Sequence, residues 1–227
     1  MGRPRKDSQI VDAKQRLIDS LWRLLEERRL HEVTVGMVSI DAKCNRGTFY
    51  YHYEDMDQLV KRAVELEFLA PSATLNKLFG TMAAAEDHSL IEEASNSREV
   101  KRIALLIEQG GFDVAFASAI DFVLRLWKRI LCAEGEEITP EARVIIEYAV
   151  CGLFGMFTSS IRTRQETASS FVPKTDPMTN FALENSRFVF AQICKAQGVS
   201  QEEAAARLRM SEDFIQDIQK ETSQAKK

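Results

Sequence analysis

The side chains with the widest choice of chemistry lie together in the stretch from Thr34 to Tyr53. It ends with an arginine, a glycine and a threonine, followed by Phe, Tyr, Tyr, His and Tyr. Guanidinium and hydroxyl groups donate hydrogen bonds to phosphate oxygens and base edges, while methyl groups and rings touch thymine methyls. Five ring-bearing residues in succession cannot all face inward from one short helix, so several must be displayed to solvent. This combination is typical of a surface that enters a DNA groove.

Two short helices on either side of a polar turn are needed to position these groups. Thr34 predicts the start of the first helix, because its hydroxyl can accept from an orphan backbone amide, and Asn45 predicts the start of the second in the same way. Phe49 is expected to point inward. Three- and four-residue spacing in the first helix predicts one buried stripe of Val35, Val38 and Ala42.

The second of these helices carries most of the candidate DNA contacts. Its arginine suits a guanine edge, its glycine lets the backbone approach, and its threonine and second tyrosine suit a thymine methyl or a phosphate. Its first tyrosine and its histidine are expected to be phosphate ligands. The candidates are Arg46, Gly47, Thr48, Tyr50, Tyr51 and His52.

Further candidates lie outside that helix. Thr34 is expected near a phosphate at a helix N-terminus, and Lys43 adds a positive charge in the turn. The chain starts with a basic arm, which includes Arg3 and Arg5, and its Gly-Arg-Pro core resembles the segment that AT-hook peptides lay in the minor groove. The alternative for this arm is a terminus that only aids solubility.

The run from Arg46 to Tyr53 resembles the recognition helix of TetR/AcrR-type bacterial transcriptional regulators, and the resemblance extends from about Lys14 to Leu59. It implies an all-α protein with a helix-turn-helix DNA-binding domain in residues 1–62 and an effector-binding and dimerisation domain in residues 63–227. It further implies a homodimer on a palindromic double-stranded DNA operator, with a small-molecule effector. Repression is the expected direction of regulation.

The sequence departs from that family at five positions. Arg29 stands where a glycine is usual, which predicts either a strained bend or a longer last turn of the first helix. Ile40 lies on a usually polar face, where it is either exposed or in contact with another helix. Lys43 and Cys44 replace glycine and valine, and Cys44 is expected to behave as a small apolar residue. Met56 replaces a frequent lysine. The alternative function is therefore a related coactivator or interaction protein that has lost or weakened operator binding.

Composition indicates an ordinary helical protein with its positive charge near the N-terminus. The 227 residues are 45% apolar, with five prolines, ten glycines and a net charge of −4. Residues 1–62 carry 12 Lys and Arg against 10 Asp and Glu, whereas residues 63–227 carry 18 against 24. An acidic remainder is expected to stay away from phosphate.

No residue pattern calls for catalysis, a metal or a cofactor, so we expect a protein that is not an enzyme. Cysteines are scattered without metal-ligand spacing, which predicts reduced thiols. The N-terminus does not resemble a signal peptide and no charge-free stretch of about 18 residues occurs, so we expect a cytoplasmic protein without a membrane partner. The cysteines are Cys44, Cys132, Cys151 and Cys194.

Longer helices are predicted after residue 71, at residues 72–85, 97–109, 112–132, 139–164 and 177–196. Thr139 followed by a proline predicts a helix start, and Gly110 and Gly135 predict breaks. The last two fit the family's four-helix dimer interface, and small residues at helical spacing would let a second helix approach closely. The alternative is that these small residues serve packing within one chain. The dimer candidates are Ala149, Gly152, Gly155, Phe181 and Phe188, and those for an effector pocket, or else plain core, are Phe116, Trp127 and Phe154.

The segment from residue 199 to residue 222 is spaced like a second helix-turn-helix of the phage-repressor kind. Acidic side chains at Glu212, Asp213 and Asp217 would repel phosphate, and Arg209 occupies a position that usually needs glycine. We interpret the segment as a capping helical hairpin.

Overall fold

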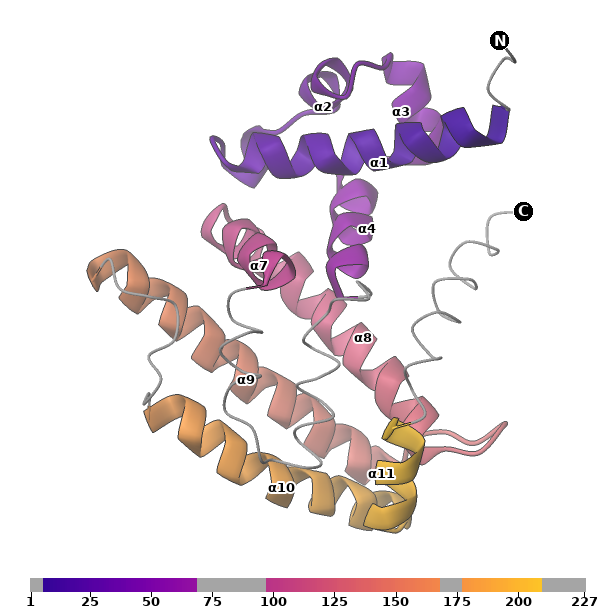
Figure 1. Cartoon of the computed structure of the whole chain (residues 1–227), viewed down its shortest axis with the longest axis vertical. Helices are drawn as coiled ribbons and strands as arrows, with labels where there is room; N and C mark the ends of the chain where they lie inside the picture. Colours follow the sequence, from indigo (N-terminus) through magenta and orange to yellow (C-terminus); the bar gives the residue numbers. More distant parts are fainter. Residues whose placement is uncertain (1–5, 69–96, 168–176, 210–227) are drawn as a thin grey trace. The chain divides into compact units, whose positions relative to one another are not determined.

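The computed structural model describes residues 6–68, 97–167 and 177–209, and every regular element in these ranges is a helix (Figure 1). The all-α prediction is therefore confirmed. Predicted helices at 97–109, 112–132, 139–164 and 177–196 agree with α7 to α10, and residues 72–85 lie outside the described ranges. The elements are α1 Lys6–Leu25, η1 Leu30–Glu32, α2 Val35–Asp41, α3 Arg46–His52, α4 Met56–Phe68, α7 Arg98–Glu108, α8 Phe112–Leu131, α9 Pro140–Thr167, α10 Pro177–Gln197 and α11 Gln201–Arg209.

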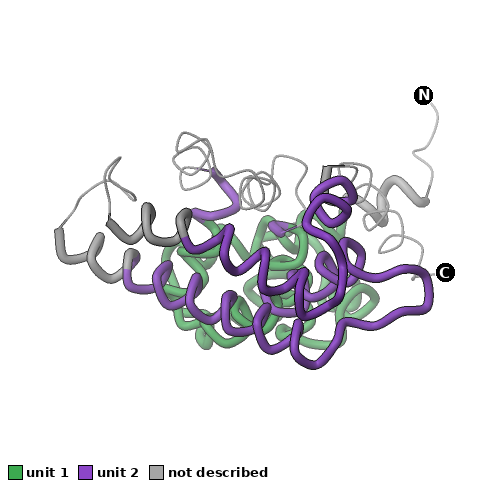
Figure 2. The backbone as a smooth tube through the Cα atoms, turned by 90° about the horizontal axis from the view of Figure 1, so that it is seen from below, with its two compact units in different colours: residues 1–66, 102–118 green, residues 67–101, 119–227 purple. Residues whose placement is uncertain are grey.

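The chain divides into two compact units, coloured separately in Figure 2. The first consists of residues 1–66 together with 102–118, and the second of residues 67–101 together with 119–227. Each unit is thus assembled from two separate stretches of sequence. The predicted boundary at residue 62 separates a DNA-binding domain from an effector-binding and dimerisation domain, and this division of function stays a prediction.

The first unit is built on the amphipathic helix α1. Leu17, Leu21 and Leu25 recur at four-residue spacing and are completely buried, which is the pattern of a helix that turns one face to a core. α2 and α3 both pack against α1 and against each other. Phe49 of α3 is also completely buried, as predicted.

The stretch 102–109 is fastened to α1 and to the segment that follows it. The Arg102 guanidinium lies 5.3 Å from the ring centre of Trp22 and 3.9 Å from the Asp19 carboxylate. The backbone N–H of Leu30 donates to the carbonyl of Gln109 over 2.9 Å. A cation above an indole ring and an ion pair both favour this placement. Residues distant in sequence therefore complete the first unit.

The end of α1 shows how the chain turns without a glycine. Arg29 has φ −68° and ψ 147°, an ordinary extended conformation, so the strained bend is wrong. The longer last turn is present instead, because the N–H groups of Glu26 and Glu27 donate to carbonyls three residues earlier. The Arg29 guanidinium donates to the carbonyl of Glu108, which fixes the side chain that replaced the glycine.

In the second unit, α9 and α10 run antiparallel along each other (Figure 1). Their shared end is closed by Thr139, whose N–H donates to Gln197 Oε1 over 2.9 Å and whose hydroxyl donates to the carbonyl of Ala196 over 3.1 Å. The same hydroxyl accepts from the N–H of Ala142, which confirms the predicted N-cap. The predicted breaks at Gly110 and Gly135 have φ of 94° and 84°, which glycine adopts without strain.

The second unit also contains the first part of the expected C-terminal hairpin. α11 packs against α10, and Arg207 donates to the carbonyl of Ile130 over 3.2 Å. The rest of the hairpin, from residue 210 to 222, lies outside the described residues.

Helix α9 is unusually apolar for its exposure. Among the described residues, Pro140–Ser159 is the one segment that is long and apolar enough to cross a membrane by length and composition, with a mean hydropathy of 1.3. Only 17% of that window is buried. A helix in the core of a single chain would be mostly buried. Burial within the described part of the chain therefore does not explain why α9 is apolar.

Candidate nucleic-acid interface

Both short helices begin at the predicted residues. The Thr34 hydroxyl accepts from the N–H of Met37 over 3.3 Å, and Asn45 Oδ1 accepts from the N–H of Thr48 over 2.7 Å. Each side chain satisfies a backbone donor that has no partner inside its helix. The two N-caps are confirmed, and Asn45 marks the end of the short turn that joins α2 to α3.

The turn contains a residue in an unusual backbone conformation. Lys43 has φ 53°, the left-handed region, where a side chain costs about 1 kcal/mol relative to glycine. Its exposed ammonium group projects from the turn. Cys44 is half-buried, and burial raises the pKa of its thiol, so it stays neutral and behaves as the small apolar residue expected there.

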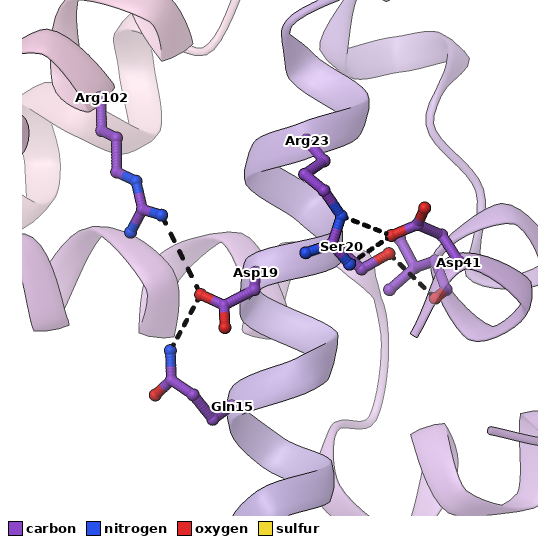
Figure 3. Close-up of polar contacts among 7 residues, drawn as sticks. Gln15, Asp19, Ser20, Arg23, Asp41 and Arg102 are labelled. Carbon is purple, nitrogen blue, oxygen red and sulfur yellow. Dashed lines mark hydrogen bonds and ion pairs between the residues drawn. The ribbon is translucent and has the colours of Figure 1, made fainter. Parts of the chain in front are cut away.

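Polar contacts attach α2 to α1 (Figure 3). The buried Ser20 hydroxyl donates to the carbonyl of Val38 over 3.0 Å. The Arg23 guanidinium donates twice to Asp41 Oδ2, over 3.0 and 2.6 Å, and this pairing lowers the pKa of the Asp41 carboxyl. A hydrogen bond at the middle of α2 and an ion pair at its end therefore fix how the helix lies on its support.

The aromatic run on α3 divides between core and surface. Phe49, Tyr53 and His52 are 0%, 2% and 8% exposed, whereas Tyr50 and Tyr51 are 59% and 71% exposed. Burial raises the pKa of Tyr53 to about 12. The Phe49 and Tyr50 rings meet edge to face, with centres 5.5 Å apart. A phosphate ligand must present its donor to solvent, so the buried His52 is left out of the interface proposed below.

The other predicted contacts occupy the outside of the α2–α3 pair. Ile40, which was expected to be either exposed or in contact with another helix, is 80% exposed. Arg3 and Arg5 lie outside the described residues, and their role stays a prediction. Thr48 is half-buried, and the exposed candidates are Thr34, Lys43, Arg46 and Gly47.

The start of α4 carries negative charge close to this pair in sequence. Asp55 Oδ1 accepts from the N–H of Gln58 and Gln58 Oε1 accepts from the N–H of Glu54, both over 2.8 Å. The side chains of Asp55 and Gln58 thus satisfy backbone N–H groups at the start of α4. Exposed Glu54 and Asp57 disfavour a nearby phosphate, and the half-buried Met56 adds no positive charge.

The three pocket candidates each pack against another aromatic ring. Phe116 in the first unit stacks on Phe112 with ring centres 5.7 Å apart. In the second unit, Trp127 lies 5.8 Å from Phe190, and Phe154 lies 6.2 Å from Phe157. These contacts give each ring a packing role, and an effector site at these residues stays a prediction.

Two of the candidates for self-association, Gly152 and Gly155, lie on an exposed stripe of α9. A Cβ added at Gly152 or at Gly155 would meet no described atom within 4 Å, so packing inside the described part of the chain does not account for these glycines. Ala149 is half-buried beside the stripe, Phe188 of α10 is 62% exposed, and the Phe181 side chain is outside the described set. The α9 stripe consists of Val144, Tyr148, Cys151, Gly152, Gly155 and Ser159.

Sequence reasoning did not find the contacts that hold α2 in place. Arg23 and Asp41 are 18 positions apart and lie on different helices, so no local spacing indicates that they pair. The buried Ser20 would have been the available signal, because a polar residue within an apolar helix face usually has a hydrogen-bond partner.

The remaining observations concern ligands and relatives. Within residues 6–68, 97–167 and 177–209, no three His, Cys, Asp or Glu side chains come together as a metal site would require. Comparisons of the chain with protein-family models, with curated proteins and with solved structures found no match. The function therefore has to be argued from the chain's own residues and geometry.

Proposed function

We propose that this protein is a TetR-like, ligand-responsive transcriptional regulator, with repression as the expected outcome, that binds a palindromic operator as a homodimer. The observation that carries the proposal is the α2–α3 pair, two short helices joined by a tight turn, which we interpret as a helix-turn-helix. Phe49 anchors α3 in the core, while Tyr50 and Tyr51 stand exposed on the same short helix. In such motifs the second helix enters the major groove and the first crosses the sugar-phosphate backbone.

The chemistry of the exposed surface supports this function. Tyr50 and Tyr51 offer hydroxyl donors and ring contacts, and Lys43 and Arg46 offer positive charge. Thr48 offers its methyl group, because its hydroxyl donates to Asn45 Oδ1 over 3.1 Å. Donors to phosphate set the register of a protein on DNA, and contacts to base edges distinguish sequences. The helix carrying them is short and anchored by a buried ring, so these groups project from a fixed support.

The proposed homodimer rests on the α9 stripe. Tyr148 and Val144 are 78% and 65% exposed on a helix whose glycines leave open space. Exposed apolar surface of this kind is typical of a protein interface, and small residues let two helix backbones approach. A second copy is the occupant we propose, because a two-fold dimer presents two copies of α3 to two half-sites about 34–36 Å apart, or a multiple of that distance.

Regulation follows from a difference in binding energy between two conformations of the dimer. An effector that fills the helical second unit and favours one spacing of the two α3 helices changes operator affinity by that difference. The effector proposed is a small molecule of unidentified chemistry, with no catalytic turnover. A bacterial regulator of genomic DNA acts in the cytoplasm, which is the compartment we propose.

The direct test is salt-dependent binding of the full-length protein to duplexes selected from a randomised library. Wild-type protein should enrich a palindromic site, and affinity should fall steeply as salt rises. Tyr51→Ala should weaken binding about tenfold, the loss of roughly one good contact. Lys101→Ala on α7 is the matched control for loss of an exposed side chain, and should leave binding unchanged. Absence of salt-sensitive binding would contradict the proposal.

The start of α4 favours one alternative function. Met56 stands where the TetR/AcrR family often carries a lysine, and its neighbours Glu54, Asp55 and Asp57 are carboxylates, which suits a TetR-like interaction protein with lost or weakened operator binding. The same selection separates the two functions, since an interaction protein of this kind would enrich no sequence.

A further inference from the structure

The side chain of Arg46 in α3 lies against Gly36 in α2. A Cβ built on Gly36 would lie 2.8 Å from Arg46 Nη2 and 3.5 Å from Cζ. Real Cβ atoms do not tolerate the first distance, so the guanidinium occupies space that only glycine leaves free. Arg46 therefore lies back against the first turn of α2.

The position of Arg46 in its helix explains this direction. Arg46 is the first residue of α3, and helical side chains lean toward the N-terminus of their own helix. At the first position this lean carries the side chain away from α3 and toward α2. Its guanidinium thus lies beside the helix that crosses the sugar-phosphate backbone in motifs of this kind.

The guanidinium remains available to a ligand. In the described part of the chain, the structure shows no hydrogen bond or ion pair for Arg46, and its side chain is exposed. The carboxylate of Asp41, at the other end of α2, is engaged by Arg23. Arg46 therefore has donors free for an oxygen anion on the α2 side of the motif.

We propose that Arg46 contacts a backbone phosphate beside α2 instead of a guanine edge, and that Gly36 is the positioning residue that permits it. This inference rests on the proposed DNA-binding function and replaces the contact expected from sequence. Reading of base edges then falls to Thr48, Tyr50 and Tyr51. Arg46 contributes register and affinity, but no sequence preference.

The first experiment needs no DNA. Gly36→Ala places a methyl group where the Arg46 guanidinium lies. In the NMR spectrum of the free protein, the Arg46 Nε–Hε resonance should therefore shift, while the backbone amide resonances of α1 should stay unchanged. The fold should tolerate the change, because alanine is favoured over glycine inside a helix. An unchanged Arg46 resonance would overturn the positioning role.

The second experiment uses the duplex selected by wild-type protein and its single-base variants. Arg46→Ala should weaken binding about tenfold on every duplex alike and lower the salt slope by about one per protomer. Arg46→Lys should keep the salt slope, because a lysine still neutralises a phosphate but does not reproduce a two-bond guanine contact. Relaxed preference at one base pair in Arg46→Ala would overturn the phosphate assignment.

A double-variant comparison links the two residues. Gly36→Ala should reduce affinity, by no more than Arg46→Ala does, and the double variant should bind no more weakly than Arg46→Ala alone. Additive losses, or full affinity in Gly36→Ala, would overturn the inference and leave DNA binding standing. If wild-type protein enriches no duplex and binds none with salt dependence, the proposed function falls, and this inference falls with it.

Discussion

The outer surfaces of α3 and α9 differ in the kind of side chain that they leave in water. α3 displays Tyr50 and Tyr51 beside donors, around a completely buried Phe49. α9 displays Val144 and Tyr148 beside glycines with open space around them. Hydrogen-bonding groups are well solvated when no ligand is bound, so the α3 surface suits a ligand that binds reversibly. Leaving apolar area exposed to water costs about 25 cal/mol per Å², which favours a stable protein interface at the α9 surface.

The first prediction tests whether the α3 surface depends on its buried anchor. Phe49→Ala should lower the free energy of unfolding by about 3–5 kcal/mol, because it removes a fully buried ring from beneath α2 and α3. Urea unfolding measures the loss. Tyr50→Ala is the exposed comparison and should cost less than about 1 kcal/mol. Equal losses would mean that the core and surface sides of α3 were assigned wrongly.

The second prediction tests whether the α9 stripe is covered by a second copy. Gly155→Glu should raise the dimer dissociation constant at least about 100-fold, because it inserts a charge and a side chain where two helices approach. The monomer should fold normally, since the position is open. Sedimentation velocity over a concentration series measures the change. Ala117→Glu makes the same charge change on α8, and a similar loss there would contradict a specific interface.

A third prediction separates backbone strain from charge at the turn. Lys43→Gly should stabilise the protein by about 1 kcal/mol, because glycine accepts the left-handed conformation without a Cβ. It should also weaken DNA binding and lower its salt slope by about one per protomer. Lys43→Ala keeps the strain and loses the charge, so it should weaken binding equally without the gain in stability. Thermal unfolding and salt titration check both parts.

The smallest expected effect concerns the ion pair that supports α2. The lowered pKa of Asp41 means that its stabilisation is complete at neutral pH and is lost as pH falls below about 4. Asp41→Asn should cost less than about 1 kcal/mol at pH 7, since both partners are partly exposed, and nothing near pH 2. Arg23→Gln should give the same loss. A difference from wild type that persists in acid would implicate another contact.

The sequence predicted those features that depend on neighbours along the chain. Thr34, Asn45 and Thr139 were recognisable as helix starts because an N-cap acts within three residues. Gly110 and Gly135 were recognisable as breaks for a similar local reason. The inward Phe49 followed from the helical period and from the impossibility of burying five ring-bearing residues at once.

Features that depend on distant residues were not predictable in the same way. The Arg23 and Asp41 pair and the position of Arg102 above Trp22 arise only when separate helices meet. Of the two alternatives for Arg29, the strained bend was wrong, because the carbonyl of Glu108 holds the Arg29 side chain and the last turn of α1 is longer. The exposure of His52 was overestimated, since spacing on a short helix did not show how its ring would be covered.

The two-part composition of the first unit has a consequence for protein synthesis. Arg102 contacts Trp22 and Asp19, and the N–H of Leu30 donates to the carbonyl of Gln109. The first unit therefore stays incomplete until Arg102 and Gln109 have been synthesised. Domains commonly fold in order as they leave the ribosome. Here, the N-terminal helices can complete the first unit only after residue 118 has emerged from the ribosome. A fragment that ends at residue 68 would lack the part of the first unit that residues 102–118 supply.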